Sequence, residues 1–256
     1  MKRILIFVLF LFSFFATSAW SDDERKCSEV LPKHLEFTHN CQAIKGKVDF
    51  YRAFPAVAPN GLVNAVVTMP AGTNVKWLVD VQTGVLRVEP APVIIMLGLT
   101  VSGPTNDREK GKVKAVKPNV INYLGQIGNY GLVPHTVDVD GNPLDILVIG
   151  GPLLRGSVTP VKLIGAMKFQ DAYAGVETHK LIAVLPGTPL AELVNTLADL
   201  DMNAIGAKSI IQTWLENYKG PSALVLDSNG LLEAGDSFDG GLDGTAYGVL
   251  NDSIIE

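Results

Sequence analysis

The stretch 137–148 most constrains how this chain can fold, because it places acidic residues in a tight turn between two strand-forming runs. Asp-Gly and Asn-Pro follow one another at 140–143, and both dipeptides are typical of turns. Asp138 and Asp140 are two residues apart, so they would share one face of an extended segment. Asp145 then begins the returning apolar run. Carboxylates at a strand end favour a hard cation such as Mg²⁺, although the same residues also occur in turns that have no function.

The composition favours one ordinary globular domain with an appendage. The chain has 256 residues, of which 47% are hydrophobic and 18% are charged. This length and apolar content are enough to bury a sizeable core. The formal net charge is -5, and a mildly acidic balance gives no reason to expect nucleic acid or an anionic membrane as a partner.

The N-terminus has the pattern of a secretory signal peptide. Lys2 and Arg3 precede an apolar run over 4–15, which is followed by small residues up to Ala19. The run is shorter than the roughly 20 residues that a membrane span needs. We therefore expect a signal peptide over 1–20 and an exported protein, periplasmic or secreted, with no membrane association after cleavage. An uncleaved anchor is the alternative.

Two cysteines, Cys27 and Cys41, follow this signal. In an exported chain an even number of cysteines indicates a disulfide, which would lie in an N-terminal extension over 21–60. The alternative is two free thiols. A zinc site with His34 and His39 is disfavoured, because the spacing lacks the close ligand pairs of such sites.

Short apolar runs separated by turn residues predict most of the remaining elements. The strands are expected at 62–69, 76–80, 85–88, 144–149, 161–167 and 180–184. Thr188 and Pro189 resemble the start of a helix that would run to about 200, and a second helix is expected over 203–218. We therefore predict an α+β fold over 61–226, with a small closed five-stranded β-barrel of OB type, two flanking helices and a loose tail over 227–256.

The acidic turn also resembles a known signature. Residues 140–146 read Asp-Gly-Asn-Pro-Leu-Asp-Ile, and the soluble inorganic pyrophosphatases carry Asp-x-Asp-Pro-apolar-Asp-apolar. Other pieces similar to that family follow in the same order along the chain: Pro70 before Lys76, Asn129-Tyr130-Gly131, Asp171, Lys180 in its apolar run, and Tyr218-Lys219. The chain is identified as a divergent member of this family.

The resemblance implies hydrolysis of pyrophosphate, or of a related small phosphoanhydride, by a metal-activated water with Mg²⁺ as cofactor. It implies metal binding by Asp140, Asp145 and Asp171. It implies substrate binding by Lys76, Tyr130, Lys180, Tyr218 and Lys219. It assigns the catalytic centre to Asp145, Asn142 and Tyr130. It also allows a homo-oligomer, because family members commonly assemble.

The chain departs from the family at the centre of this signature. Asn142 replaces the central Asp, and an amide oxygen can ligate a metal but cannot act as a base. The phosphate-binding arginine of the family corresponds to Pro90, and Arg87 lies on the other strand face by parity. Uncharged residues also replace acidic or tyrosine positions at Thr68, Leu78, Gln126 and Thr178, and 91–128 contains an insertion. A degenerate, non-catalytic relative that binds phosphate compounds outside the cytoplasm is therefore the alternative.

Overall fold

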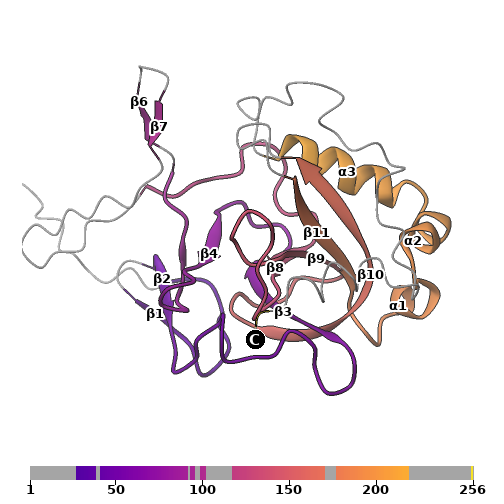
Figure 1. The fold of residues 1–256 in the computed structure, drawn as a ribbon, viewed down its shortest axis with the longest axis horizontal. Coiled ribbons are helices and arrows are strands. Elements are labelled where there is room, and N and C mark those ends of the chain that lie inside the picture. Colours follow the sequence, from indigo (N-terminus) through magenta and orange to yellow (C-terminus); the bar gives the residue numbers. More distant parts are fainter. Residues whose placement is uncertain are drawn as a thin grey trace, which may run out of the picture.

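A closed five-stranded barrel forms the centre of the molecule (Figure 1). The computed structural model describes residues 27–38, 41–91, 93–95, 99–101, 117–170, 177–218 and 255. Around the barrel the strand order is β10-β11-β9-β8-β3. The bounds are β3 (Val63–Met69), β8 (Asn129–Leu132), β9 (Asp145–Ile149), β10 (Val158–Gln170) and β11 (Glu177–Val184). The β9–β11 pair is parallel and the other pairs are antiparallel. The predicted fold class is confirmed.

A second sheet of four strands packs beside the barrel, in the order β1-β2-β5-β4. Its strands are β1 (Glu36–Thr38), β2 (Ala43–Lys45), β4 (Trp77–Val79) and β5 (Leu86–Val88). Strands β1 and β2 were not expected, because three residues are too short to show a period of two. A separate hairpin consists of β6 (Val93–Ile95) and β7 (Leu99–Val101). The N-terminal extension therefore supplies half of a sheet whose other half comes from the segment between β3 and β8.

Within the described part of the chain, three helices flank the barrel where two were predicted: α1 (Pro189–Leu193), α2 (Leu197–Asn203) and α3 (Ala207–Asn217). The single helix expected over 189–200 is wrong, because Val194 is extended, with φ -122° and ψ 120°. Thr196 then begins a new helix, and its side chain accepts from the backbone N–H of Asp199 at 3.0 Å. The Asp199 carboxylate in turn accepts a hydrogen bond from the backbone N–H of Thr196 at 3.0 Å. This reciprocal cap fixes α2 as a separate helix.

Alternate residues of the barrel strands enter two different hydrophobic clusters. Ile146 and Leu181 belong to a cluster built almost entirely from barrel residues. Leu147 and Ile182 belong to a larger cluster that includes the helices and the outer sheet. Because the helices lie outside the barrel (Figure 1), the larger cluster marks its outer face and the smaller one fills its interior. Side chains in phase with Leu147 therefore point outward, toward the second sheet and the helices.

Two residues of β8 make close contacts with neighbouring strands and loops of the barrel. A Cβ on Gly131 would lie 2.0 Å from the carbonyl oxygen of Val66, so only glycine fits at this approach of β8 to β3. The buried Asn129 side chain accepts from the N–H groups of Ala71 and Leu153, at 3.2 and 2.8 Å. It therefore ties the loops that follow β3 and β9 to the same strand.

Several predicted features fall outside the described residues. These are the signal peptide over 1–20, Asp171, Lys219 and, apart from residue 255, the tail over 227–256. Cys27 and Cys41 form a disulfide within the described extension. Among the helices that the structure describes, none is both long and apolar enough to span a bilayer.

Candidate functional site

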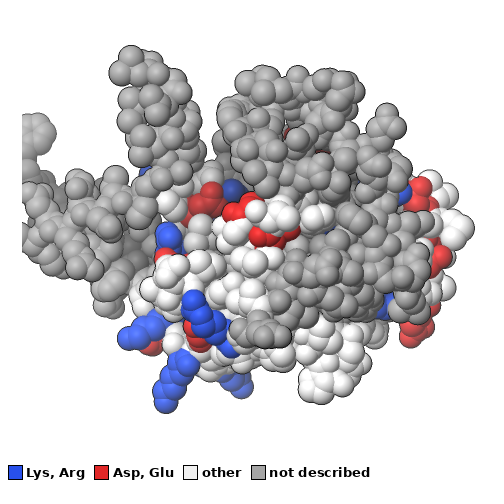
Figure 2. Space-filling model, in the orientation of Figure 1, with Lys and Arg blue, Asp and Glu red and all other residues white. Residues whose placement is uncertain are grey.

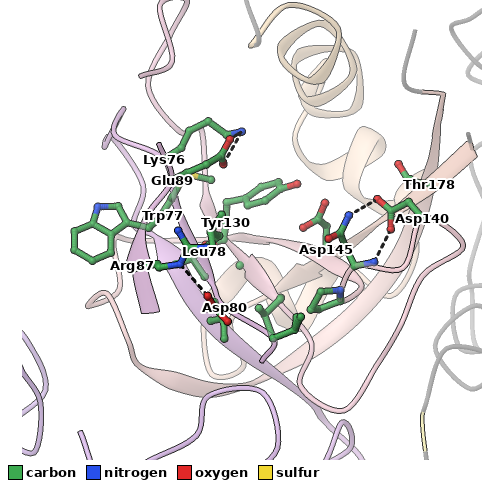
Figure 3. Close-up of a pocket in the computed structure, with 18 of the residues that line it drawn as sticks. Lys76, Trp77, Leu78, Asp80, Arg87, Glu89, Tyr130, Asp140, Asp145 and Thr178 are labelled. Atoms are coloured by element: carbon green, nitrogen blue, oxygen red, sulfur yellow. Dashed lines mark hydrogen bonds and ion pairs between the residues drawn. The ribbon is translucent and has the colours of Figure 1, made fainter. Parts of the chain in front are cut away.

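A cavity of about 950 Å³ lies between the outer face of the barrel and the second sheet. It brings together seven of the nine site residues expected from the sequence: Lys76, Tyr130, Asp140, Asn142, Asp145, Lys180 and Tyr218. The remaining two, Asp171 and Lys219, are outside the described residues. Figure 3 shows Lys76 and Glu89 on one side of the cavity, Asp140 and Asp145 on the other, and Tyr130 between them. Figure 2 shows acidic side chains gathered near the middle of this face of the molecule, beside a basic one.

The barrel side of the pocket is organised by one register pair. Asp145, the first residue of β9, lies opposite Lys180 of β11 in the parallel ladder. Both residues are in phase with Leu147 and Ile182, so both side chains leave the outer face. The Lys180 ammonium donates to the Asp145 carboxylate, and it also lies 3.4 Å from the Thr178 hydroxyl. Lys180 is buried, whereas a third of the Asp145 side chain is exposed.

The acidic turn contributes Asp140 and Asn142 to the pocket. Both the backbone N–H and the side-chain Nδ2 of Asn142 donate to the Asp140 carboxylate, at 2.9 and 3.0 Å. A carboxylate can only accept hydrogen bonds, so the amide nitrogen must face Asp140 and the amide oxygen points away from it. Asn142 therefore holds Asp140 in place and keeps one neutral oxygen available as a ligand.

The expectation that Asp138 and Asp140 share a face is wrong. The segment is not extended, because Asp138 and Asn142 close a turn in which the Asp138 N–H donates to the Asn142 carbonyl at 2.7 Å. The Asp138 side chain turns away from the pocket and accepts from the backbone N–H of His179 at 2.7 Å. Its other oxygen lies 3.0 Å from Nδ1 of the same histidine. Asp138 therefore anchors the turn to β11.

The sheet side of the pocket begins with a lysine and glutamate pair. The ammonium of Lys76 lies 2.9 Å from Oε2 of Glu89 and 3.0 Å from Oε1. Glu89 also accepts from the Asn119 amide at 2.7 Å. Lys76 was expected here from the sequence, whereas Glu89 was not. Glu89 could have been found, because polar and apolar residues alternate from Leu86 to Glu89.

Arg87 also lines the pocket, which corrects the parity argument against it. Its Nε donates to the Asp80 carboxylate at 3.2 Å, and both residues belong to the lining. Arg87 and Glu89, two residues apart, both belong to the lining and Pro90 does not, so the pocket face is that of Arg87 and not that of Pro90. Burial acts to raise the pKa of Asp80, but hydrogen bonds from Thr83 and Gln82 and the Arg87 charge lower it below its ordinary value. Asp80 is therefore a fixed anion that orients Arg87.

Two tyrosines close the pocket between its two sides. Tyr130 of β8 is buried, and this burial, followed by the negative charge of Asp145, raises its pKa well above the ordinary value. It therefore stays a neutral phenol that can donate a hydrogen bond at physiological pH. Tyr218 ends α3 and stacks on Trp214, with 4.8 Å between ring centroids and 16° between planes. The helix thus holds Tyr218, the residue that caps its C-terminus, in the pocket in a fixed orientation.

Two positions that are acidic in the family are Thr68 and Leu78 in this chain, and both residues line the pocket. Thr68 is buried and its hydroxyl lies 3.3 Å from the carbonyl of Tyr130. Leu78 lies directly opposite Arg87 in the register of β4 and β5. The cavity therefore keeps its walls but has fewer carboxylates than the family signature implies.

Comparison with known proteins identifies the family to which the chain is related. The family described as inorganic pyrophosphatase matches residues 65–232, which is most of the chain and the barrel except for the first two residues of β3.

The chain belongs to the inorganic pyrophosphatase family. An inorganic pyrophosphatase of Kluyveromyces lactis is 31% identical over 175 residues, which cover 63% of this chain and 54% of that protein. A type I inorganic pyrophosphatase structure from Toxoplasma gondii aligns with a TM-score of 0.61 at 21% identity, covering 82% of this chain and 89% of that one.

A vacuolar soluble pyrophosphatase of Trypanosoma cruzi, solved in complex with PPi, aligns with a TM-score of 0.56 at 20% identity. That alignment covers 81% of this chain and 74% of the other, and both structural likenesses establish the shared fold. The chain spans about half the length of the Kluyveromyces lactis and Drosophila melanogaster relatives that it matches, 54% and 46%.

Inorganic pyrophosphatases depend on metal ions, so we tested whether the residues present fit one. Within the described part of the chain, no cluster of three or more Asp, Glu, His or Cys side chains forms a complete metal cage. Asp140, Asp145 and the amide oxygen of Asn142 nevertheless offer oxygen donors on one side of the pocket. Mg²⁺ commonly uses one or two carboxylates and takes its remaining ligands from water and substrate phosphates. The donor set fits an ion of that kind.

Proposed function

We propose that this protein hydrolyses inorganic pyrophosphate to two phosphates and uses Mg²⁺ as its metal. The observation that carries the proposal is one pocket in which Lys76, Arg87 and Lys180 face the carboxylates of Asp140 and Asp145. Pyrophosphate is a small polyanion, so a site for it needs converging cations, and hydrolysis also needs carboxylates that hold metal ions.

When substrate binds, the cations of the pocket would exchange their carboxylate partners for phosphate oxygens. Each of the three pocket cations has a carboxylate neighbour: Lys76 with Glu89, Arg87 with Asp80 and Lys180 with Asp145. Phosphate oxygens would take over as acceptors for these cations. The carboxylate of Asp145 would then be released toward a metal ion that arrives with the substrate. Metal and substrate should therefore each strengthen the binding of the other.

The metal would be held by Asp140, Asp145 and the Asn142 oxygen. When bound, it supplies positive charge against the phosphates and lowers the pKa of a water molecule. Tyr130 remains protonated between the two walls and donates a hydrogen bond to a phosphate oxygen. Asn142 cannot accept the proton of the attacking water. We assign that role to the neighbouring Asp140 carboxylate, which the two Asn142 hydrogen bonds orient.

The products are two phosphate ions, and their release restores the pocket. Attack on one phosphorus breaks its bond to the bridging oxygen, which departs with the other phosphate. Lys76 and Arg87 line the side opposite the acidic turn, so they would neutralise the charge that develops on the departing group. Once both phosphates leave, the three ion pairs can reform.

The proposal also places the activity outside the cytoplasm. Support comes from the signal-like N-terminus and from the Cys27–Cys41 disulfide, which is typical of oxidising compartments. Pyrophosphate or a related phosphoanhydride in that compartment would be the substrate.

Phosphate release from pyrophosphate, with and without Mg²⁺, tests the proposal on residues 21–256. The wild type should turn over with Mg²⁺, Asp145→Ala should abolish turnover, and Asn142→Asp should raise it. Glu36→Gln, at an exposed position on β1, is the control and should behave as wild type. Binding of the analogue imidodiphosphate without any turnover, in both the wild type and Asn142→Asp, would support the non-catalytic alternative.

A further inference from the structure

Arg155 is a buried cation beneath the pocket that the proposed chemistry does not use. It lies in the loop between β9 and β10, and only 3% of its side chain is exposed. We propose that Arg155 is a positioning residue for the sheet wall, which is the side of the pocket formed by β4 and β5, and that the disulfide-anchored segment around Glu29 holds Arg155 in place. This inference uses the proposed function for its kinetic test, but its structural test is independent of turnover.

The contacts of Arg155 join the N-terminal segment to the pocket lining. Its Nε donates to both carboxylate oxygens of Glu29, at 3.0 and 3.1 Å. Its Nη1 donates to the backbone carbonyl of Thr68, and its guanidinium lies 4.5 Å from the centre of the Trp77 ring. Thr68 and Trp77 both line the cavity. One planar cation therefore spans β3, β4 and the extension.

Trp77 transmits this contact to the charged residues of the wall. It lies between Lys76 and Leu78 in sequence and pairs with Val88 of β5. A shift of the indole ring would therefore move Lys76 on one strand and, through the Val88 pairing, Arg87 on the other. These two residues supply the cations on the sheet side of the pocket.

Glu29 is held by a covalent link rather than by its own strand. Cys27 lies two residues before it and is bonded to Cys41, which lies two residues before β2. Strand β2 in turn pairs Ala43 with Arg87 of β5. Burial lowers the pKa of Arg155 and the charge of Glu29 opposes that effect, so the guanidinium depends on this carboxylate. Releasing the segment would leave a buried cation without its counter-ion.

The loop that carries Arg155 is itself fitted against the extension. Gly156 has φ +75°, and a Cβ there would lie 2.7 Å from Cδ1 of Leu35 and 3.4 Å from Phe50. The extension, through Leu35 and Phe50, is therefore packed closely against the loop. Loss of the disulfide would loosen both partners of the Arg155–Glu29 pair.

Reduction of the disulfide gives the first test. A dithiol reagent donates two electrons and two protons, so that Cys27 and Cys41 become thiols and the reagent becomes a cyclic disulfide. Hydrogen exchange followed by mass spectrometry should then show faster exchange of amides in β4 and β5. Exchange in β9 and β11, on the other side of the pocket, should be unchanged. Equal acceleration of all these strands would overturn the proposal, because it would mean general destabilisation.

Glu29→Gln gives the second test, with Glu36→Gln of the exposed β1 position as its matched control. Glu29→Gln should raise the KM for pyrophosphate about 10- to 100-fold, because small misplacements of binding groups have effects of that size. Its kcat should change less, and the control should leave both constants unchanged. An unchanged KM in the folded variant would overturn the proposal.

The double variant Glu29→Gln/Arg155→Met separates positioning from stability. It removes both charges and leaves an apolar side chain, so the melting temperature should recover relative to Glu29→Gln alone. The KM should stay high if Arg155 positions the wall, and it should return to the wild-type value if the pair only stabilises the fold. If the protein has no turnover at all, calorimetric affinity for imidodiphosphate replaces KM, so failure of the proposed function remains distinguishable.

Discussion

Arg87 and Leu78 are direct partners in the antiparallel register of β4 and β5, so their side chains lie on the same face of the sheet. That face lines the pocket. In the family signature position 78 is acidic, whereas here it is apolar and lies opposite a cation. Arg87 is therefore the charged member of this register pair, and it is a group suited to phosphate oxygens rather than to metal ions.

Arg87→Gln should weaken substrate binding more than it slows turnover. Loss of a charge-assisted hydrogen bond is worth about 1.5–3 kcal/mol, so the KM should rise by roughly 10- to 100-fold. Arg87→Lys should recover only part of this, because an ammonium cannot reproduce the planar guanidinium. Steady-state kinetics at saturating Mg²⁺ measures both constants. Lys45→Gln, at an exposed position in the same sheet, is the control, and an equal effect there would point to general electrostatics.

Asn142→Asp should restore a base at the centre of the acidic turn. Turnover should increase, but by less than the roughly 10²- to 10⁴-fold that a positioned general base contributes, because Asp140 already accepts the proton in the wild type. The same change places a second carboxylate against Asp140, where the amide now donates a hydrogen bond. Without Mg²⁺ the variant should therefore melt at a lower temperature than wild type, and Mg²⁺ should close the gap. A variant with unchanged turnover would show that Asp140 already supplies all the basicity that the site uses.

Asp145→Asn should cost stability as well as activity, because it leaves the buried ammonium of Lys180 facing an amide. Asp145 is about one-third exposed, so we expect the loss in unfolding free energy at the low end, about 1–3 kcal/mol. The double variant Asp145→Asn/Lys180→Met should recover this stability without recovering turnover. Urea denaturation and phosphate release measure the two effects separately. Recovery of both together would remove Asp145 and Lys180 from the catalytic site.

Mg²⁺ and a pyrophosphate analogue should each raise the affinity for the other, because Asp145 is engaged by Lys180 until phosphate oxygens replace its partner. Calorimetric titration of Mg²⁺ with and without imidodiphosphate should show a coupling of about 5- to 150-fold, the range typical of linked sites. Lys180→Gln should raise the affinity for Mg²⁺ alone and reduce the coupling. Equal Mg²⁺ affinity with and without the analogue would rule out the exchange.

Asp138 should contribute stability that disappears in acid. Burial acts to raise its pKa, but hydrogen bonds from His179 lower it below the ordinary value. The unfolded chain then binds the proton more readily, so the contribution is complete above the unfolded pKa of about 4 and is lost as the pH falls through the folded value. The stability difference between wild type and Asp138→Asn should therefore shrink at low pH. Denaturation at a series of pH values measures this, and a constant difference would contradict it.

Sequence patterns revealed the barrel side of the molecule better than the sheet side. Strands such as β3 and β9 are long enough to show their apolar run, and the turn signals around residues 140–143 mark where one of them begins. The break at Val194 was missed, although Thr196 and Asp199 have the spacing of a reciprocal cap and so mark the start of a new helix. Local patterns predicted the element types here but not the point of interruption.

The site residues were also predicted better on the barrel side of the pocket than on the sheet side. The motif residues Lys76, Tyr130, Asp145 and Lys180 were expected and do meet in one cavity. Glu89 was missed as the counter-ion of Lys76 and Asp80 as that of Arg87, because a sequence alone does not show which acid faces which base. Arg87 was excluded because the alignment with the family gave the pocket face to Pro90, whereas the lining contains Arg87 and Glu89 from the opposite face of that strand.

The contribution of the N-terminal segment has a practical consequence. Strand β2 covers one side of β5, and the region that matches the family begins only at residue 65. A fragment trimmed to that region would expose the backbone N–H and C=O groups of β5 along an open edge, next to the pocket that Arg87 lines. Such a shortened chain should self-associate through this edge.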